Sequence, residues 1–73
     1  GLQSVSVVSQ DDTLADALST ALFVMGLDAG AALYRAGDLA FEAVFMTDDG
    51  SVWITPGLAG QYQSDRPYQV LQP

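Results

Sequence analysis

Apolar and polar residues alternate with a period of two at the start of the chain and with a helical period directly after it. Residues 2–9 alternate small polar and β-branched side chains, which predicts a strand with one buried face. From Thr13 to Met25 apolar residues recur every three or four positions and Gly26 supplies a stop, so we predict a helix there. A second, shorter helix is predicted from Asp28 to Ala36, with Asp28 as N-cap and Gly37 after its end.

The second half of the chain predicts a hairpin and a tail. Residues 39–47 alternate again and predict a strand, Asp48–Gly50 supplies a turn, and residues 51–55 return as a second strand. Residues 59–73 are polar and contain two prolines, which predicts an irregular tail with one short extended stretch at 68–71. The fold class is therefore α+β, with the order β-α-α-β-β and a helical hairpin packed on an antiparallel sheet.

Neither side of the first predicted helix has the charged residues typical of a solvent-exposed face. Its core-facing stripe consists of Leu14, Leu18, Ala21, Leu22 and Met25. The opposite side carries Asp16, Thr20, Phe23 and Val24. The helix contains no Lys, Arg or Glu, and such a helix is usually buried between two layers, which a chain of 73 residues can hardly provide. We therefore expect further protein to cover the side with Asp16 and Thr20.

Composition narrows the possible functions. A chain of 73 residues forms one small domain with a thin core, and it has neither cysteine nor histidine, so disulfides, thiolate metal sites and a histidine base are excluded. A net charge of −7 with two cationic residues argues against binding to nucleic acid or to an anionic membrane. The longest apolar run, residues 21–26, is far too short for a membrane span.

Asp16 and Thr20 are the residues with the clearest candidate chemistry. Their i, i+4 spacing places a carboxylate beside a hydroxyl on one helix face. One interpretation is structural: Thr13 and Asp16 form a capping box, and Thr20 bonds to the carbonyl four residues back. The other is a site for a hard metal ion, of which two oxygen ligands make only part, because Mg²⁺ takes about six.

Two stretches of sequence resemble a known family. "DDTLADALSTALFVMGLDAGAALY" and "FEAVFMTDDGSVWITPGL" are similar to the C-terminal segment of the FAD:protein FMN transferases, the ApbE flavin-transferase family. The matching elements are the run Ala15–Ala21, Gly26, the Asp49–Gly50 turn and Thr55–Leu58. The resemblance covers about residues 2–60. It implies that residues 1–73 are the C-terminal segment of a single larger α/β flavin-transferase domain.

The resemblance also implies an activity. Family members move FMN from FAD to a Ser/Thr hydroxyl of an acceptor flavoprotein and release AMP, and a magnesium ion takes part. By this resemblance Asp16 and Thr20 are the metal ligands, while FAD is bound mainly by the N-terminal part of the enzyme. We therefore expect this segment alone to be inactive, its partners to be that N-terminal part and the acceptor, and its location to be the cell envelope or periplasm.

Two other classes of function stay open on the sequence. The chain could be a binding module that has kept the fold without the active half, or a non-catalytic structural α+β module in which Asp16 is only a helix cap. Other polar and aromatic residues have ordinary structural interpretations. We expect the Asp48–Asp49 pair to form a hairpin turn rather than a calcium site, Glu42 to be an edge or solvent-facing residue rather than a general base, and the aromatic residues Phe41, Phe45 and Trp53 to belong to the core.

Overall fold

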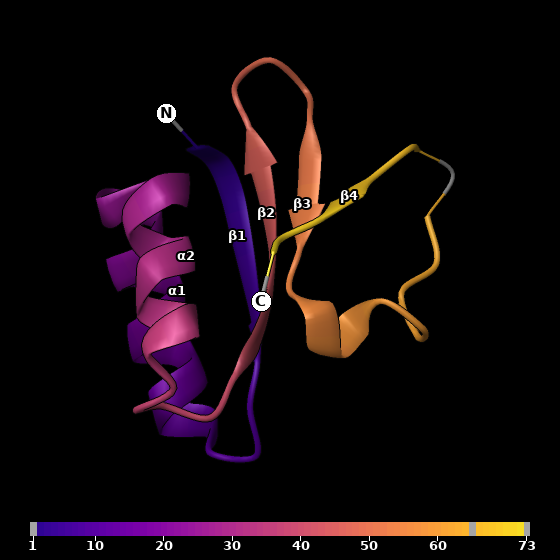
Figure 1. The fold of residues 1–73 in the computed structure, drawn as a ribbon. Helices are drawn as coiled ribbons and strands as arrows, with labels where there is room; N and C mark the ends of the chain where they lie inside the picture. Colours follow the sequence, from indigo (N-terminus) through magenta and orange to yellow (C-terminus); the bar gives the residue numbers. More distant parts are fainter. Residues whose placement is uncertain (1, 65, 73) are drawn as a thin grey trace.

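The chain forms a four-stranded sheet with two helices on one of its faces (Figure 1). The computed structural model describes residues 2–64 and 66–72. Along the chain the elements are β1 (Leu2–Val8), α1 (Asp12–Met25), α2 (Leu27–Ala36), β2 (Glu42–Thr47), β3 (Val52–Ile54), the 3-10 helix η1 (Pro56–Leu58) and β4 (Gln69–Val70). The predicted α+β class and the order β-α-α-β-β are confirmed. Among the described helices, none is long and apolar enough to cross a membrane.

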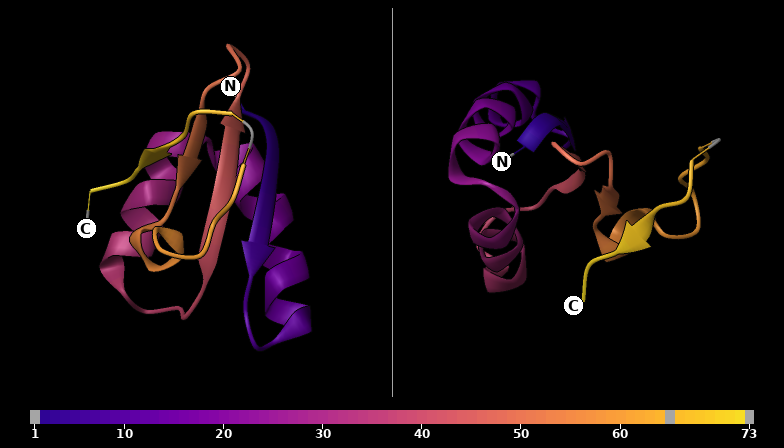
Figure 2. Two further views of the ribbon diagram at one scale, coloured as in Figure 1. Left: turned by 90° about the vertical axis from the view of Figure 1, so that its right-hand side faces the viewer. Right: turned by 90° about the horizontal axis from the view of Figure 1, so that it is seen from above.

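The sheet has the strand order β1-β2-β3-β4. β2 pairs antiparallel with both β1 and β3, and Phe45 stands opposite Val5 on one side and Trp53 on the other. β4 pairs parallel with β3, which makes the sheet mixed rather than purely antiparallel. The reason is the path of the tail, which leaves η1, crosses the face away from the helices and returns beside β3 (Figure 2). The extended stretch expected at 68–71 thus becomes β4, while residues 65 and 73 of the predicted tail lie outside the described part.

β2 begins three residues later than its pattern predicts. Val8 is the last residue of β1 and stands opposite Glu42, so residues 39–41 have no strand beside them. The alternation itself is confirmed, since Phe41, Ala43 and Phe45 are buried on the helix side.

α1 starts one residue before the predicted helix, and its N-cap is Asp11. The Asp11 carboxylate accepts a hydrogen bond from the backbone N–H of Leu14 at 3.1 Å. The capping box expected from Thr13 and Asp16 is therefore not what begins the helix. Asp16 is the fifth residue of α1 and lies beyond the first turn.

A single glycine joins the two helices. Gly26, with φ of 90°, donates its N–H to the Leu22 carbonyl at the end of α1 and accepts from the N–H of Gly30 at the start of α2. The expectation that Asp28 caps α2 is wrong, because the chain turns at Gly26 and enters α2 at Leu27. Asp28 lies in the first turn, where its charge is favourable to the helix dipole.

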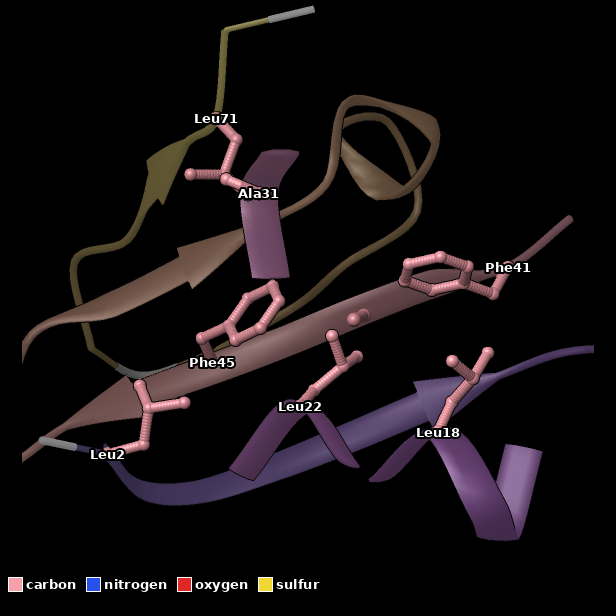
Figure 3. Packing of buried hydrophobic residues seen from close by; sticks show 8 residues of the cluster. Leu2, Leu18, Leu22, Ala31, Phe41, Phe45 and Leu71 are labelled. Atoms are coloured by element: carbon pink, nitrogen blue, oxygen red, sulfur yellow. The ribbon is translucent and has the colours of Figure 1, made fainter. Parts of the chain in front are cut away.

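The core lies between the helices and the sheet. Leu18 and Leu22 of α1 and Ala31 of α2 meet Phe41 and Phe45 (Figure 3). α2 comes close to the sheet at Gly30, where a Cβ atom would lie 3.1 Å from a ring carbon of Phe45. The core role expected for the aromatic residues is thus confirmed for both phenylalanines, and Trp53 packs against the same cluster while half-buried.

Candidate functional site

Asp16 and Thr20 lie one turn apart on α1, on the side away from the sheet. Leu18 and Leu22, which alternate with them along the helix, are buried with 5% and 0% of their surface exposed. Asp16 and Thr20 are both exposed. The opposite side with this pair is therefore as predicted, but the core stripe is narrower than predicted, because Ala21 is exposed and Met25 keeps 43% of its surface exposed.

The local hydrogen bonds leave both side chains available. Within residues 2–64 and 66–72, neither the Asp16 carboxylate nor the Thr20 hydroxyl has a hydrogen-bond partner. The Asp11 carboxylate, not Asp16, accepts the first-turn N–H of Leu14. The Asp16 carbonyl, which the Thr20 hydroxyl was expected to reach, instead accepts a hydrogen bond from the Ser19 hydroxyl at 2.9 Å. Neither purely structural interpretation of the pair is thus realised in the described residues.

The donor set fits a hard cation as a partial site. A carboxylate and a hydroxyl are the oxygen ligands that Mg²⁺ accepts, and this ion usually keeps several waters or takes phosphate oxygens in its remaining positions. No group of three or more metal-binding side chains gathers anywhere in the described part of the chain. Asp16 and Thr20 can therefore supply only part of a coordination sphere, and their role as ligands stays a prediction.

Three exposed apolar residues follow this pair at the end of α1. Phe23, Val24 and Met25 keep 48%, 81% and 43% of their surfaces exposed. Three consecutive large apolar residues on one exposed helix end are typical of a surface that contacts more protein.

A second polar constellation centres on Glu42, at the start of β2. Its Oε1 atom accepts hydrogen bonds from the Tyr34 hydroxyl at 2.9 Å and from the Thr55 hydroxyl at 2.6 Å. Thr55 is fully buried, and its hydroxyl oxygen accepts the N–H of Ala43 at 3.0 Å, so its own proton is directed at Glu42. The expectation that Glu42 is an edge or solvent-facing residue is therefore wrong, because this carboxylate is half-buried and ties α2 to the junction of β3 and η1.

The surroundings of Glu42 act on Tyr34 and on Gly57. Burial, followed by the hydrogen bond and the negative charge of Glu42, raises the pKa of the Tyr34 hydroxyl, and the backbone of Gly57 opposes this shift. A Cβ atom on Gly57 would lie 2.3 Å from the Glu42 carboxyl carbon, so only glycine fits beside the carboxylate as it stands. The Thr55–Leu58 stretch was visible in the sequence, but its contact with Glu42 was not, because thirteen residues separate Glu42 from Thr55.

The hairpin aspartates form a turn, as expected. The Asp49 carboxylate accepts hydrogen bonds from the Thr47 hydroxyl and from the Ser51 N–H, and these two residues lower its pKa, the Thr47 hydroxyl most. Gly50 completes the turn with φ of 87°.

The comparisons with known proteins point to one family. No curated protein and no solved structure matches the chain. The sequence model of the ApbE family matches residues 1–45, a stretch that contains β1, both helices, Asp16, Thr20 and Glu42. Because this match covers more than half of the 73 residues, the chain belongs to the ApbE family.

Proposed function

We propose that the chain is the C-terminal part of a magnesium-dependent FAD:protein FMN transferase. One observation carries the proposal: within the stretch that matches the family, α1 presents a carboxylate and a hydroxyl one turn apart, and neither is used by the described residues. The resemblance of the "ADALSTA" run supports the same pair as the metal ligands.

Asp16 would supply the anionic ligand and Thr20 a neutral hydroxyl ligand. When bound, magnesium supplies a hard Lewis acid that neutralises charge on phosphate oxygens. In the proposed reaction an acceptor Ser/Thr oxygen bonds to the FMN phosphorus, the pyrophosphate bond of FAD breaks, and AMP leaves. The described chain contributes ligands to this centre, while the flavin and adenine are held mainly by the N-terminal part of the enzyme.

The exposed apolar end of α1 supports a larger enzyme. Phe23, Val24 and Met25 lie beyond Thr20 along α1 and would pack against that N-terminal part. Such packing would exclude water from one side of the ligand pair, which strengthens electrostatic interactions there. The alternative in which Asp16 is only a helix cap has less support, since Asp11 performs that role.

The test uses the complete enzyme with FAD, Mg²⁺ and an acceptor protein, and follows both AMP release and covalently bound flavin. Asp16→Ala should abolish FMN transfer, while Thr20→Ser should retain part of it and Thr20→Val should lose it. Ser19→Ala is the matched control, because that hydroxyl bonds only to the backbone and should be dispensable for transfer. Undiminished transfer by Asp16→Ala would show that the pair is not the metal site.

A further inference from the structure

A groove lies beside α1, on a different side of the helix from Asp16 and Thr20. It has a volume of about 880 Å³ and runs between the β1–α1 loop, the end of α2 and the start of β2. Val8, Leu14 and Leu39 contribute apolar walls, and Tyr34, Phe41 and Glu42 contribute aromatic and acidic surface. Volumes of this size with mostly apolar walls and a few polar groups are typical of binding sites.

The charged groups of the groove have one sign. Among the described lining residues Asp11 and Glu42 are the charged ones, and Asp11 uses its Oδ1 atom to cap α1. The two cationic residues of the chain bond elsewhere: Arg35 donates to the Gln72 carbonyl, and Arg66 contacts the Met46 sulfur. A ligand of this groove would therefore be expected to bring positive charge.

One oxygen of the Glu42 carboxylate is not used by the two hydroxyl donors. Oε1 accepts both hydrogen bonds, whereas Oε2 has no hydrogen-bond partner within the described residues. Among those same residues, no side-chain oxygen or nitrogen is buried without a partner, so Oε2 is in contact with solvent. The two hydroxyl donors hold the carboxylate in place without consuming this second oxygen.

The aromatic pair in the groove favours the same kind of ligand. The rings of Tyr34 and Phe41 meet edge to face, with centroids 5.5 Å apart. A cation near an aromatic face gains attraction from the ring quadrupole, and an alkyl stem fits apolar walls such as Leu14 and Leu39. A carboxylate, the half-buried ring of Tyr34 and apolar walls together suit the side chain of lysine or arginine.

We propose that this groove binds a basic side chain of the acceptor polypeptide, with Glu42 as the counter-ion. The inference rests on the proposed function, because that reaction uses a protein as acceptor. A polypeptide occupant also matches the charge of the chain, since a net charge of −7 favours a partner segment that is basic. Glu42 is then a residue that selects and positions the acceptor, while the metal ligands lie on the other side of α1.

The binding test needs neither FAD nor metal, so it can fail independently of the proposed function. The intact protein is labelled with ¹⁵N, and the amide shifts of Gln10, Gly37 and Ala40, which line the groove, are followed in two titrations. The probes are N-acetyl-lysine-N-methylamide and its uncharged analogue N-acetyl-norleucine-N-methylamide. We expect saturable shifts with the lysine probe and binding about tenfold weaker with the norleucine probe.

Three variants complete the experiment. Glu42→Gln keeps an acceptor oxygen for Tyr34 and Thr55 but removes the charge, and should weaken the lysine probe about tenfold. Asp28→Asn removes the same charge outside the groove and should leave the affinity unchanged. Leu39→Lys places a cation at the exposed wall without touching the Glu42 hydrogen bonds, and should abolish binding.

Three results would overturn the proposal. The first is an absence of saturable shifts at the groove, and the second is equal binding of the lysine and norleucine probes. The third is an unchanged affinity of Glu42→Gln for the lysine probe, which would show that the carboxylate is not the counter-ion.

Discussion

Replacement of Gly57 by alanine tests whether the Glu42 carboxylate is held as tightly as its hydrogen bonds indicate. The new Cβ would lie 2.3 Å from the Glu42 carboxyl carbon and 2.4 Å from each oxygen, so the carboxylate must move. Moving it is easy only if nothing holds it. Here the Tyr34 and Thr55 hydroxyls both donate to Oε1, and both bonds would break.

The cost follows from those two bonds. A hydrogen bond to a charged group contributes about 1.5–3 kcal/mol. The Tyr34 hydroxyl is half-buried and can bond to water instead, whereas the Thr55 hydroxyl is fully buried and cannot. We therefore take the lower half of the free-energy range for two such bonds. Gly57 has an ordinary backbone conformation, so alanine should return about 0.4–1 kcal/mol by restricting the unfolded chain. We expect Gly57→Ala to lower the free energy of unfolding by about 3 kcal/mol.

Urea unfolding of a double-mutant cycle measures this directly. In a Glu42→Ala background the clash is gone, and Gly57→Ala should be neutral or slightly stabilising. Gly60→Ala is the control, because a Cβ there meets nothing within 4 Å. If Gly57→Ala cost the same with and without Glu42, the carboxylate would not be the group that requires glycine, and the reasoning would fail.

Three further predictions concern stability. Leu22→Ala removes a side chain with 0% exposure and should lower the free energy of unfolding by about 3 kcal/mol in urea. Asp11→Ala should cost about 1 kcal/mol while Thr13→Ala costs nothing measurable, and the reverse order would restore Thr13 as the cap. The pKa of Tyr34 is raised in the folded protein above its ordinary value of 10.0. The free energy of unfolding therefore keeps the contribution of this residue below pH 10.0 and loses it as the pH rises through the folded pKa. Urea midpoints at about pH 9 and about pH 11 should differ more for the natural protein than for Tyr34→Phe.

The helices could be predicted because their signals are local. The apolar stripe of α1 and the glycines that end both helices lie within a few residues of the positions they determine. The Asp16–Thr20 pair was found for the same reason, since both side chains stand on one helix at i, i+4. The position of this pair opposite Leu18 and Leu22 then follows from the helical period alone.

The choice of helix cap could not be predicted from local preference. Asp11, Asp12 and Thr13 are all residue types that cap helices well. The end of β1 decides among them: the Ser9 hydroxyl accepts the N–H of Asp11 at 3.2 Å and bonds to the Ala40 carbonyl, which fixes Asp11 in an extended conformation. This choice depends on a contact with residue 40, far along the chain.

The Glu42 constellation was missed for a related reason. It needs the register of β2 against β3 and the position of α2, neither of which is encoded within a few residues. A half-buried glutamate at the start of a strand has the same local pattern whether it faces water or two hydroxyl groups. The sequence did contain the Thr55–Leu58 stretch. In the structure Thr55 donates a hydrogen bond to the Glu42 carboxylate, and Gly57 leaves room for it.

The orientation of α1 links the core to the proposed metal site. If the helix rotated to bury Phe23 and Val24, Asp16 would turn toward the sheet, where a charged carboxylate without a partner is strongly unfavourable. The rotation that buries Leu18 and Leu22 instead leaves Asp16 and Thr20 accessible, and leaves the apolar end of the helix exposed as a consequence. A protein surface that covers this side of α1 must therefore satisfy two demands at once. It must bring a cation or hydrogen-bond donors to Asp16 and Thr20, and an apolar surface to Phe23 and Val24.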